Sequence, residues 1–293
     1  MWGGIGSRDR SGGMEPKPVP NRCIWCLEEP PNATFKSESH VLPKCIGNIE
    51  KQVLPPGIVC DRCNKSFGRK VEPALIDEPI LSTLAGILEL RDIDSNFTYA
   101  HSPSGIHRIA HTEAEVSANR ITLNTQYQIK GQPDKPDETR TISKSKDYNK
   151  RALALLSRAV HKIAFESVAH KLFVGAGLQY ARSEFEDIDI FDPGFNVIRD
   201  WVRYGKPQNS VRPALRTQKF DEVKTQEQLF IWGGETWYFQ RGICYALNLF
   251  NDWYIMSLTS STDTVESHLK SWAKTTKFNN PVWVVGDKLQ AAD

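Results

Sequence analysis

The chain has 293 residues, of which 40% are hydrophobic and 25% charged, the composition of an ordinary soluble protein that can bury a sizeable core. A formal net charge of +2 excludes a globally basic protein that coats nucleic acid, so any nucleic-acid contact must depend on local patches. No apolar run approaches the roughly 18 residues that span a bilayer, and we therefore expect a cytoplasmic protein with no membrane contact.

The start of the chain differs in composition from the rest. Residues 1–20 are rich in Gly, Pro, Arg and Ser and lack the apolar stretch of a signal peptide, so they are expected to form a disordered leader. Residues 21–76, here called the N-terminal module, hold two CxxC pairs and only short strand-like runs. Residues 77–293 are expected to form a larger α+β domain.

Helices and strands are expected to alternate in this larger domain. An apolar segment over 80–90 indicates a helix, alternating runs over 106–110 and 120–129 indicate strands, and the polar run 131–146 indicates an exposed loop.

The clearest helix is predicted over 149–173, because its apolar residues recur at spacings that keep one face apolar. His161 and His170 are assigned to its polar face. Asp192-Pro193 predicts the start of a shorter helix, because an acid before proline suits a helix start.

A C-terminal antiparallel sheet is expected to follow. Gly233-Gly234 and Asn251-Asp252 are plausible hairpin turns between its strands. The aromatic residues near the first of these turns are expected in the core, with stacking on an extruded base as the alternative. The predicted strands are 229–232, 236–240, 243–250 and 253–258, and the aromatic residues are Trp232, Trp237, Tyr238 and Phe239.

Four of the six cysteines form two CxxC pairs, Cys23/Cys26 and Cys60/Cys63. A CxxC turn lets two thiolates bind one ion, and two such turns complete a closed tetrahedral Zn²⁺ site. Closed coordination leaves no position for water, so this zinc would be structural and would stabilise a segment too small to fold on its own core.

The segments CIWC, SESHVLPK and CDRCNKSFGRKVE, in this order, resemble the HNH (ββα-metal) endonuclease family in its four-cysteine variant, over about residues 22–75. The resemblance implies a β-hairpin carrying His40 and a helix that opens at Cys63-Asn64. The predicted fold class is therefore α+β, a small zinc-bound ββα-metal module followed by a larger α+β domain with a long helix and a C-terminal antiparallel sheet.

The resemblance also implies roles for individual residues. His40 would be the general base, Asn64 would help to hold a catalytic Mg²⁺ or Mn²⁺ ion, and Asn48 is the nearest candidate for a structural asparagine. The residue before the histidine is usually acidic and supplies another ligand, but here it is Ser39. Glu38, one step earlier, or Glu72 could contribute instead.

Plainer interpretations remain open for these residues. His40 could be a surface or hydrogen-bonded histidine, and Asn64 could cap its helix. The basic residues of that helix could contact phosphates without reading sequence, or form only a solvated face. These basic residues are Arg62, Lys65, Arg69 and Lys70.

Two functions follow. The first is a metal-dependent HNH endonuclease that hydrolyses phosphodiester bonds in double-stranded DNA, in bacterial restriction or anti-phage defence. The alternative is a zinc-dependent nucleic-acid-binding protein, derived from such a module, that does not cleave. Residues 77–293 would supply recognition, homodimerisation or control by a regulatory ligand. A homodimer is considered because one module cuts one strand of the duplex.

Overall fold

The computed structural model describes about three fifths of the chain as helices, strands and their immediate connections. The expected helix over 80–90 lies outside the described residues except for Leu81, and so does the leader up to residue 16. The described residues are 17–47, 52–78, 81, 98–102, 105–109, 113–117, 120–129, 135–143, 150–175, 188–206, 214–218, 222–223, 232–239, 242–249, 252–259 and 279–284.

The N-terminal module is built from two very short strands and two helices. β1 (Ser39–His40) pairs antiparallel with β2 (Val53–Leu54). A 3-10 turn, η1 (Lys44–Ile46), follows β1, and the helices α1 (Asp61–Lys70) and α2 (Pro73–Asp77) follow β2. This order of hairpin and helix is the predicted one.

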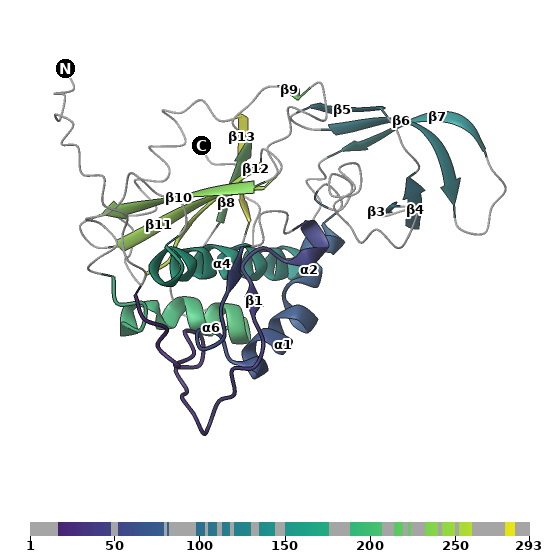
Figure 1. The fold of residues 1–293 in the computed structure, drawn as a ribbon. Coiled ribbons are helices and arrows are strands. Elements are labelled where there is room, and N and C mark those ends of the chain that lie inside the picture. The colour runs from purple at the N-terminus through teal and green to yellow at the C-terminus, as the bar shows by residue number, and fades with distance from the viewer. Residues whose placement is uncertain are drawn as a thin grey trace, which may run out of the picture.

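The long helix α4 (Lys150–Phe173) lies at the centre of the molecule (Figure 1). One side contacts β2, α2 and α6 (Asn196–Tyr204), and the other contacts strands of the C-terminal sheet. α6 begins after η2 (Pro193–Phe195), where the Asp192 carboxylate accepts a hydrogen bond from the Gly194 N–H at 2.6 Å. Both predicted helices are confirmed.

The C-terminal sheet is antiparallel, with strand order β10-β11-β12-β8-β13. Opposite Leu249, at the end of β11, lies Asp252, which begins β12, so the hairpin predicted at 251–252 is confirmed. The strands are β8 (Ala214–Gln218), β10 (Trp232–Phe239), β11 (Gly242–Leu249), β12 (Asp252–Ser257) and β13 (Asn279–Val284).

A second sheet has the order β3-β4-β6-β5-β9, with β7 also paired to β6. β4 and β6 coincide with the predicted runs at 106–110 and 120–129. The strands are β3 (Thr98–Ser102), β4 (Gly105–Ile109), β5 (Glu113–Ser117), β6 (Arg120–Ile129), β7 (Lys135–Ser143) and β9 (Glu222–Val223).

Two predictions about the strands and turns are wrong. Gly233 and Gly234 lie within β10, opposite Asn248 and Leu247, and form no turn. The polar run 131–146 contains strand β7 rather than only a loop, because pairing with β6 along its length outweighs its polar composition. Residues 229–231, predicted to begin a strand, lie outside the described residues.

One continuous core joins the N-terminal module to the rest of the described chain. It includes Trp25 and Phe67 of the module, Phe165 of α4 and Tyr245 of β11, each at most 1% exposed. Before the module, the Lys17 N–H donates to the Leu172 carbonyl at 3.0 Å. The α4 helix is thus covered on both sides.

A search of the described helices finds none with the length and apolar character needed to cross a membrane.

Candidate active site

The four cysteines of the two CxxC pairs converge at the base of α1. Their sulfur atoms all lie within 4.8 Å of one another, and Cys26 Sγ lies 3.6 Å from Cys60 Sγ. A tetrahedral Zn²⁺ ion with Zn–S bonds of about 2.3 Å separates its sulfurs by roughly 3.8 Å. The cluster is therefore compatible with one zinc ion.

The sulfurs also perturb each other's titration. The Cys23 thiol is the main cause that lowers the pKa of Cys26 and of Cys60, the latter to about 7. The pKa values of Cys23 and Cys63 are raised, chiefly by their cysteine neighbours. A bound Zn²⁺ ion deprotonates its thiol ligands, so the whole cluster can act as thiolates.

The first CxxC pair contains Trp25, and this side chain fixes the N-terminal module to α4. Its ring packs edge-on against Phe67 of α1 at 4.9 Å and against Phe165 of α4 at 5.0 Å. The indole Nε1–H donates to Glu166 Oε1 at 2.9 Å. A metal ion held by Cys23 and Cys26 would therefore also position a side chain that reaches the long helix.

The two side chains of strand β1, Ser39 and His40, lie on opposite faces of the strand. Ser39 is 1% exposed, whereas His40 is partly exposed and Glu38 is exposed. This is the alternation of a strand with one buried face. Burial lowers the pKa of His40, and the charges of Lys44 and Lys162 lower it further, so the imidazole is neutral and can accept a proton at neutral pH.

Asn64 lies in the first part of α1 and faces the chain just before His40. Its side-chain nitrogen donates to the Glu38 carbonyl at 2.9 Å and to Ser37 Oγ at 3.4 Å. The Ser39 hydroxyl lies 3.3 Å from Asn64 Oδ1. The N-cap of α1 is Cys60 and the helix starts at Asp61, so the predictions that Asn64 caps the helix and that Cys63-Asn64 opens it are wrong.

Asp61 holds the segment that leads into β1. Its carboxylate accepts hydrogen bonds from the hydroxyls of Thr34 and Ser37, each at 2.6 Å, and from the backbone N–H groups of Lys36 and Ser37. Burial raises the pKa of Asp61, but these hydrogen bonds outweigh it and bring the pKa to about 2. The start of α1 thus fixes the approach to His40.

Beneath β1 lies a buried ionic cluster that the sequence did not predict. Lys162 Nζ lies 3.1 Å from Glu166 Oε2 and 3.0 Å from Glu72 Oε1, and donates to the His40 carbonyl at 2.6 Å. Glu166 Oε2 also accepts a hydrogen bond from the Ser39 hydroxyl at 3.2 Å. Glu72 is therefore paired with a lysine.

Lys162 and Glu166 are fully buried, four residues apart on α4. Burial lowers the pKa of Lys162, but the carboxylates of Glu166 and Glu72 outweigh it and raise the pKa. Burial also raises the pKa of Glu166, against the effect of Lys162. A Lys–Glu pair spaced i,i+4 within an apolar helix was the available signal, but such a pair usually lies on a solvated face.

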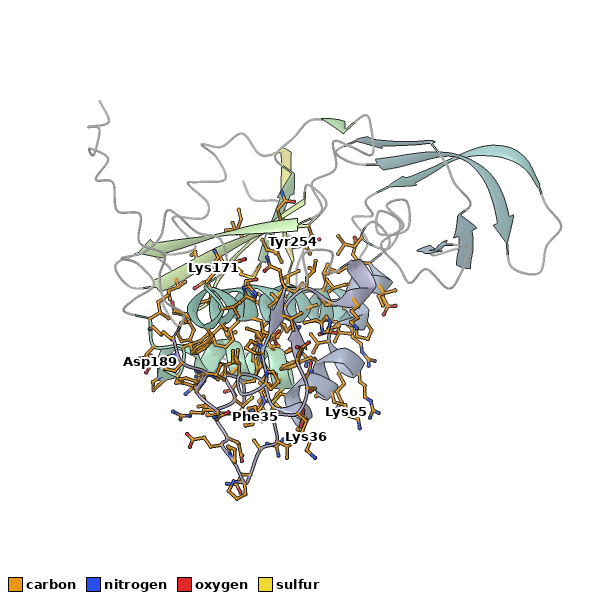
Figure 2. All side chains as sticks on the ribbon, in the orientation of Figure 1. Phe35, Lys36, Lys65, Lys171, Asp189 and Tyr254 are labelled. Carbon is orange, nitrogen blue, oxygen red and sulfur yellow. The ribbon has the colours of Figure 1, made fainter. Side chains whose placement is uncertain are left out.

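The predicted basic residues lie on the exposed side of α1. Arg62, Lys65, Arg69 and Lys70 are all exposed, and Arg62 forms an ion pair with Glu28 at 3.7 Å. Figure 2 shows Lys65 on the side of the molecule away from the C-terminal sheet, where Tyr254 lies. These cations are therefore accessible to a large polyanion.

Two other predicted residues are placed differently. His161 and His170 are 0% and 6% exposed, so their assignment to a polar face is wrong. The reason is that α4 is covered by the module on one side and by the sheet on the other. Asn48 and the side chain of Cys45 lie outside the described residues, and Cys244 is not part of the four-sulfur cluster.

Comparison with known families agrees with this geometry. Residues 23–80 match the family model for HNH endonucleases. The N-terminal module is therefore similar to HNH endonucleases and carries four cysteines positioned to hold a metal ion, which confirms the predicted resemblance, and the similarity points to a nucleic-acid substrate. No curated protein and no solved structure matches the chain.

Proposed function

We propose that this protein is a metal-dependent HNH endonuclease that hydrolyses phosphodiester bonds in double-stranded DNA. The supporting observation is the attachment of Asn64 to the three residues that precede His40, within a module that matches the HNH family. An oxygen ligand and a neutral imidazole are thereby held on adjoining elements.

The side-chain oxygens of Asn64 and Ser39 suit a hard cation. Asn64 Oδ1 and Ser39 Oγ are 3.3 Å apart. Adjacent ligands of an octahedral Mg²⁺ ion with bonds of about 2.1 Å lie roughly 3 Å apart. The side-chain nitrogen of Asn64 already donates to the Glu38 carbonyl, so Asn64 Oδ1 is the atom of this side chain that can bind the cation. Glu38 itself is exposed and can contribute its carboxylate from outside.

In the proposed reaction, His40 takes a proton from water as the water oxygen attacks phosphorus. The bond from phosphorus to the leaving oxygen breaks, and that oxygen is protonated from solvent. Bound Mg²⁺ or Mn²⁺ would supply positive charge that stabilises the transition state and the leaving oxygen. The lowered pKa of His40 keeps the imidazole in the form that accepts the proton.

The exposed basic face of α1 supports a role in holding the duplex. Lys65, Arg69 and Lys70 follow Asn64 along one helix, and phosphate contacts at such positions orient DNA without reading sequence. Residues 77–293 would then provide recognition, homodimerisation or ligand control, in bacterial restriction or anti-phage defence. This division into domains also stays a proposal.

The test is plasmid cleavage by the full-length, zinc-loaded protein with Mg²⁺ or Mn²⁺. Wild-type protein and a surface control, Lys206→Ala, should convert supercoiled DNA to nicked or linear forms. His40→Ala should lose at least about a hundredfold in rate with unchanged zinc content. Equal cleavage by His40→Ala and wild type would overturn the assignment.

The alternative function is binding without cleavage. Ser39, in the place where the family usually has an acid, is the observation that favours it. Under that alternative, wild type and His40→Ala bind the same DNA with equal affinity and neither cleaves it with any divalent cation.

A further inference from the structure

A buried carboxylate that contacts the candidate metal site comes from α4, outside the residues that match the HNH family. Glu166 Oε2 lies 3.2 Å from the Ser39 hydroxyl, and that hydroxyl lies 3.3 Å from Asn64 Oδ1. The chain of contacts therefore runs from a fully buried acid, through one serine, to the proposed metal ligand.

The two oxygen ligands on this path, from Ser39 and Asn64, are both neutral. A serine hydroxyl and an asparagine amide hold Mg²⁺ weakly, because such sites normally use one or two carboxylates. The oxygen of a hydroxyl that donates a hydrogen bond to a carboxylate becomes more negative, and outer-shell partners of this kind tune metal ligands. Glu166 can act on Ser39 in this way.

We propose that Glu166 is a positioning residue which, through Ser39, supplies the negative charge of the metal site that an acid directly before His40 would otherwise provide. This inference rests on the proposed function. It makes α4 part of the nuclease site, although α4 lies about 120 residues further along the chain.

The rest of the ionic cluster fits this role. Lys162 Nζ lies 3.1 Å from Glu166 Oε2 and 3.0 Å from Glu72 Oε1, so one cation is shared between two acids. Trp25 Nε1–H donates a hydrogen bond to Glu166 Oε1. Glu166 Oε2 forms an ion pair with Lys162 and accepts a hydrogen bond from Ser39. The carboxylate is thus fixed with one oxygen directed to Ser39.

The experiment measures Mn²⁺ affinity of the full-length, zinc-loaded protein by electron paramagnetic resonance of free Mn²⁺. Glu166→Gln should weaken Mn²⁺ binding by about tenfold to a hundredfold. The exchange variant Ser39→Asp with Glu166→Gln moves the acid onto β1 and should restore the affinity to within a few fold of wild type. A control buried acid, Glu78→Gln, should leave it unchanged.

Ser39→Ala provides a second route that leaves the contacts of Glu166 with Trp25 and Lys162 in place. It should weaken Mn²⁺ binding as much as Glu166→Gln does, with zinc content and melting temperature close to wild type. Wild-type affinity in Ser39→Ala would overturn the inference, whether or not Glu166→Gln folds. Absence of both Mn²⁺ binding and cleavage in wild type would instead overturn the proposed function itself.

Discussion

Ser39 and His40 are neighbours in sequence but belong to different environments. Ser39 faces the buried carboxylate of Glu166, and His40 lies at the partly exposed surface. The strand thus places the proposed base where substrate can reach it and the proposed ligand where water is excluded. A change in register of β1 by one residue would exchange these two environments.

Asn64 is the residue that joins helix and strand, and its loss should affect both stability and metal binding. Asn64→Ala removes the hydrogen bond to the Glu38 carbonyl, and we expect a loss of about 1 kcal/mol in the free energy of unfolding. Because the amide oxygen is also lost, Mn²⁺ affinity should fall at least about tenfold. Denaturant unfolding and Mn²⁺ titration measure the two effects; a stability loss with unchanged Mn²⁺ affinity would make Asn64 a brace only.

At this scale the sequence predicted residues with local signals. The spacing of the cysteines predicted the four-sulfur cluster, and the HNH resemblance brought out His40 and Asn64. Lys162 and Glu166 could not be found in this way, because their partners Ser39, His40 and Glu72 lie about 90 or more residues away and the i,i+4 spacing of the pair usually marks a solvated face.

Among the elements, α1 combines three tasks on ten residues. Its buried side carries Cys63 and Phe67, its start carries Asp61, which fixes the loop before β1, and its exposed side is basic. The helix can therefore link zinc, the approach to His40 and the proposed DNA contact.

The basic side of α1 gives a prediction for DNA binding. Lys65→Gln and Arg69→Gln should each weaken binding and reduce the slope of log K against log salt by about 0.9, the value for one lost phosphate contact. Arg62→Gln should have a smaller effect, because Arg62 is already paired with Glu28. Lys206→Gln, outside α1, serves as control in fluorescence anisotropy titrations. Equal salt slopes for all variants would show that α1 is only a solvated face.

Removal of zinc should disturb more than the two CxxC pairs. The cysteines position Trp25, and Trp25 packs on Phe165 of α4, so loss of the metal should expose this indole. We expect one Zn²⁺ per chain, and a red shift of tryptophan fluorescence together with a lower melting temperature when a strong chelator removes it.

Cys60→Ser should reproduce the effects of the chelator, whereas Cys244→Ser, outside the cluster, should retain zinc. A chelated protein with unchanged fluorescence and melting temperature would contradict a structural role for the metal.

The elements also show why the sequence predicted α4 well in extent but poorly in its faces. Helical periodicity and flanking glycines fixed its bounds within one residue. Periodicity assumes one solvated side, and α4 has none in its central part, where Ser157, His161 and Lys162 are buried with the apolar residues. Tertiary packing on both sides decided that outcome.

At the scale of the whole molecule, the α+β class and the order of the N-terminal module and the larger domain were predictable. That the two share one hydrophobic core was not. The module contributes Trp25 and Phe67 to a core that continues through α4 to the C-terminal sheet. Strand pairings such as β8 with β13 join segments about 65 residues apart, and the wrong turn at Gly233-Gly234 shows that glycine pairs alone do not locate hairpins.

Tyr245 reports on the contact between α4 and this sheet. It is 1% exposed on β11, and burial raises its pKa to about 12, despite a hydrogen bond with Ser167 of α4 that lowers it. The unfolded tyrosine titrates near pH 10. A folded pKa above the unfolded one contributes stability that is complete below about pH 10 and is lost as pH rises through about 12.

Between pH 10 and 12 the free energy of unfolding of wild type should therefore fall more steeply than that of Tyr245→Phe, which has no phenol to ionise. Denaturant unfolding at a series of pH values measures this difference, and absorbance near 295 nm follows the ionisation itself. Parallel pH profiles for the two proteins would mean that water reaches Tyr245. The sheet would then not seal the side of α4 that carries Ser167.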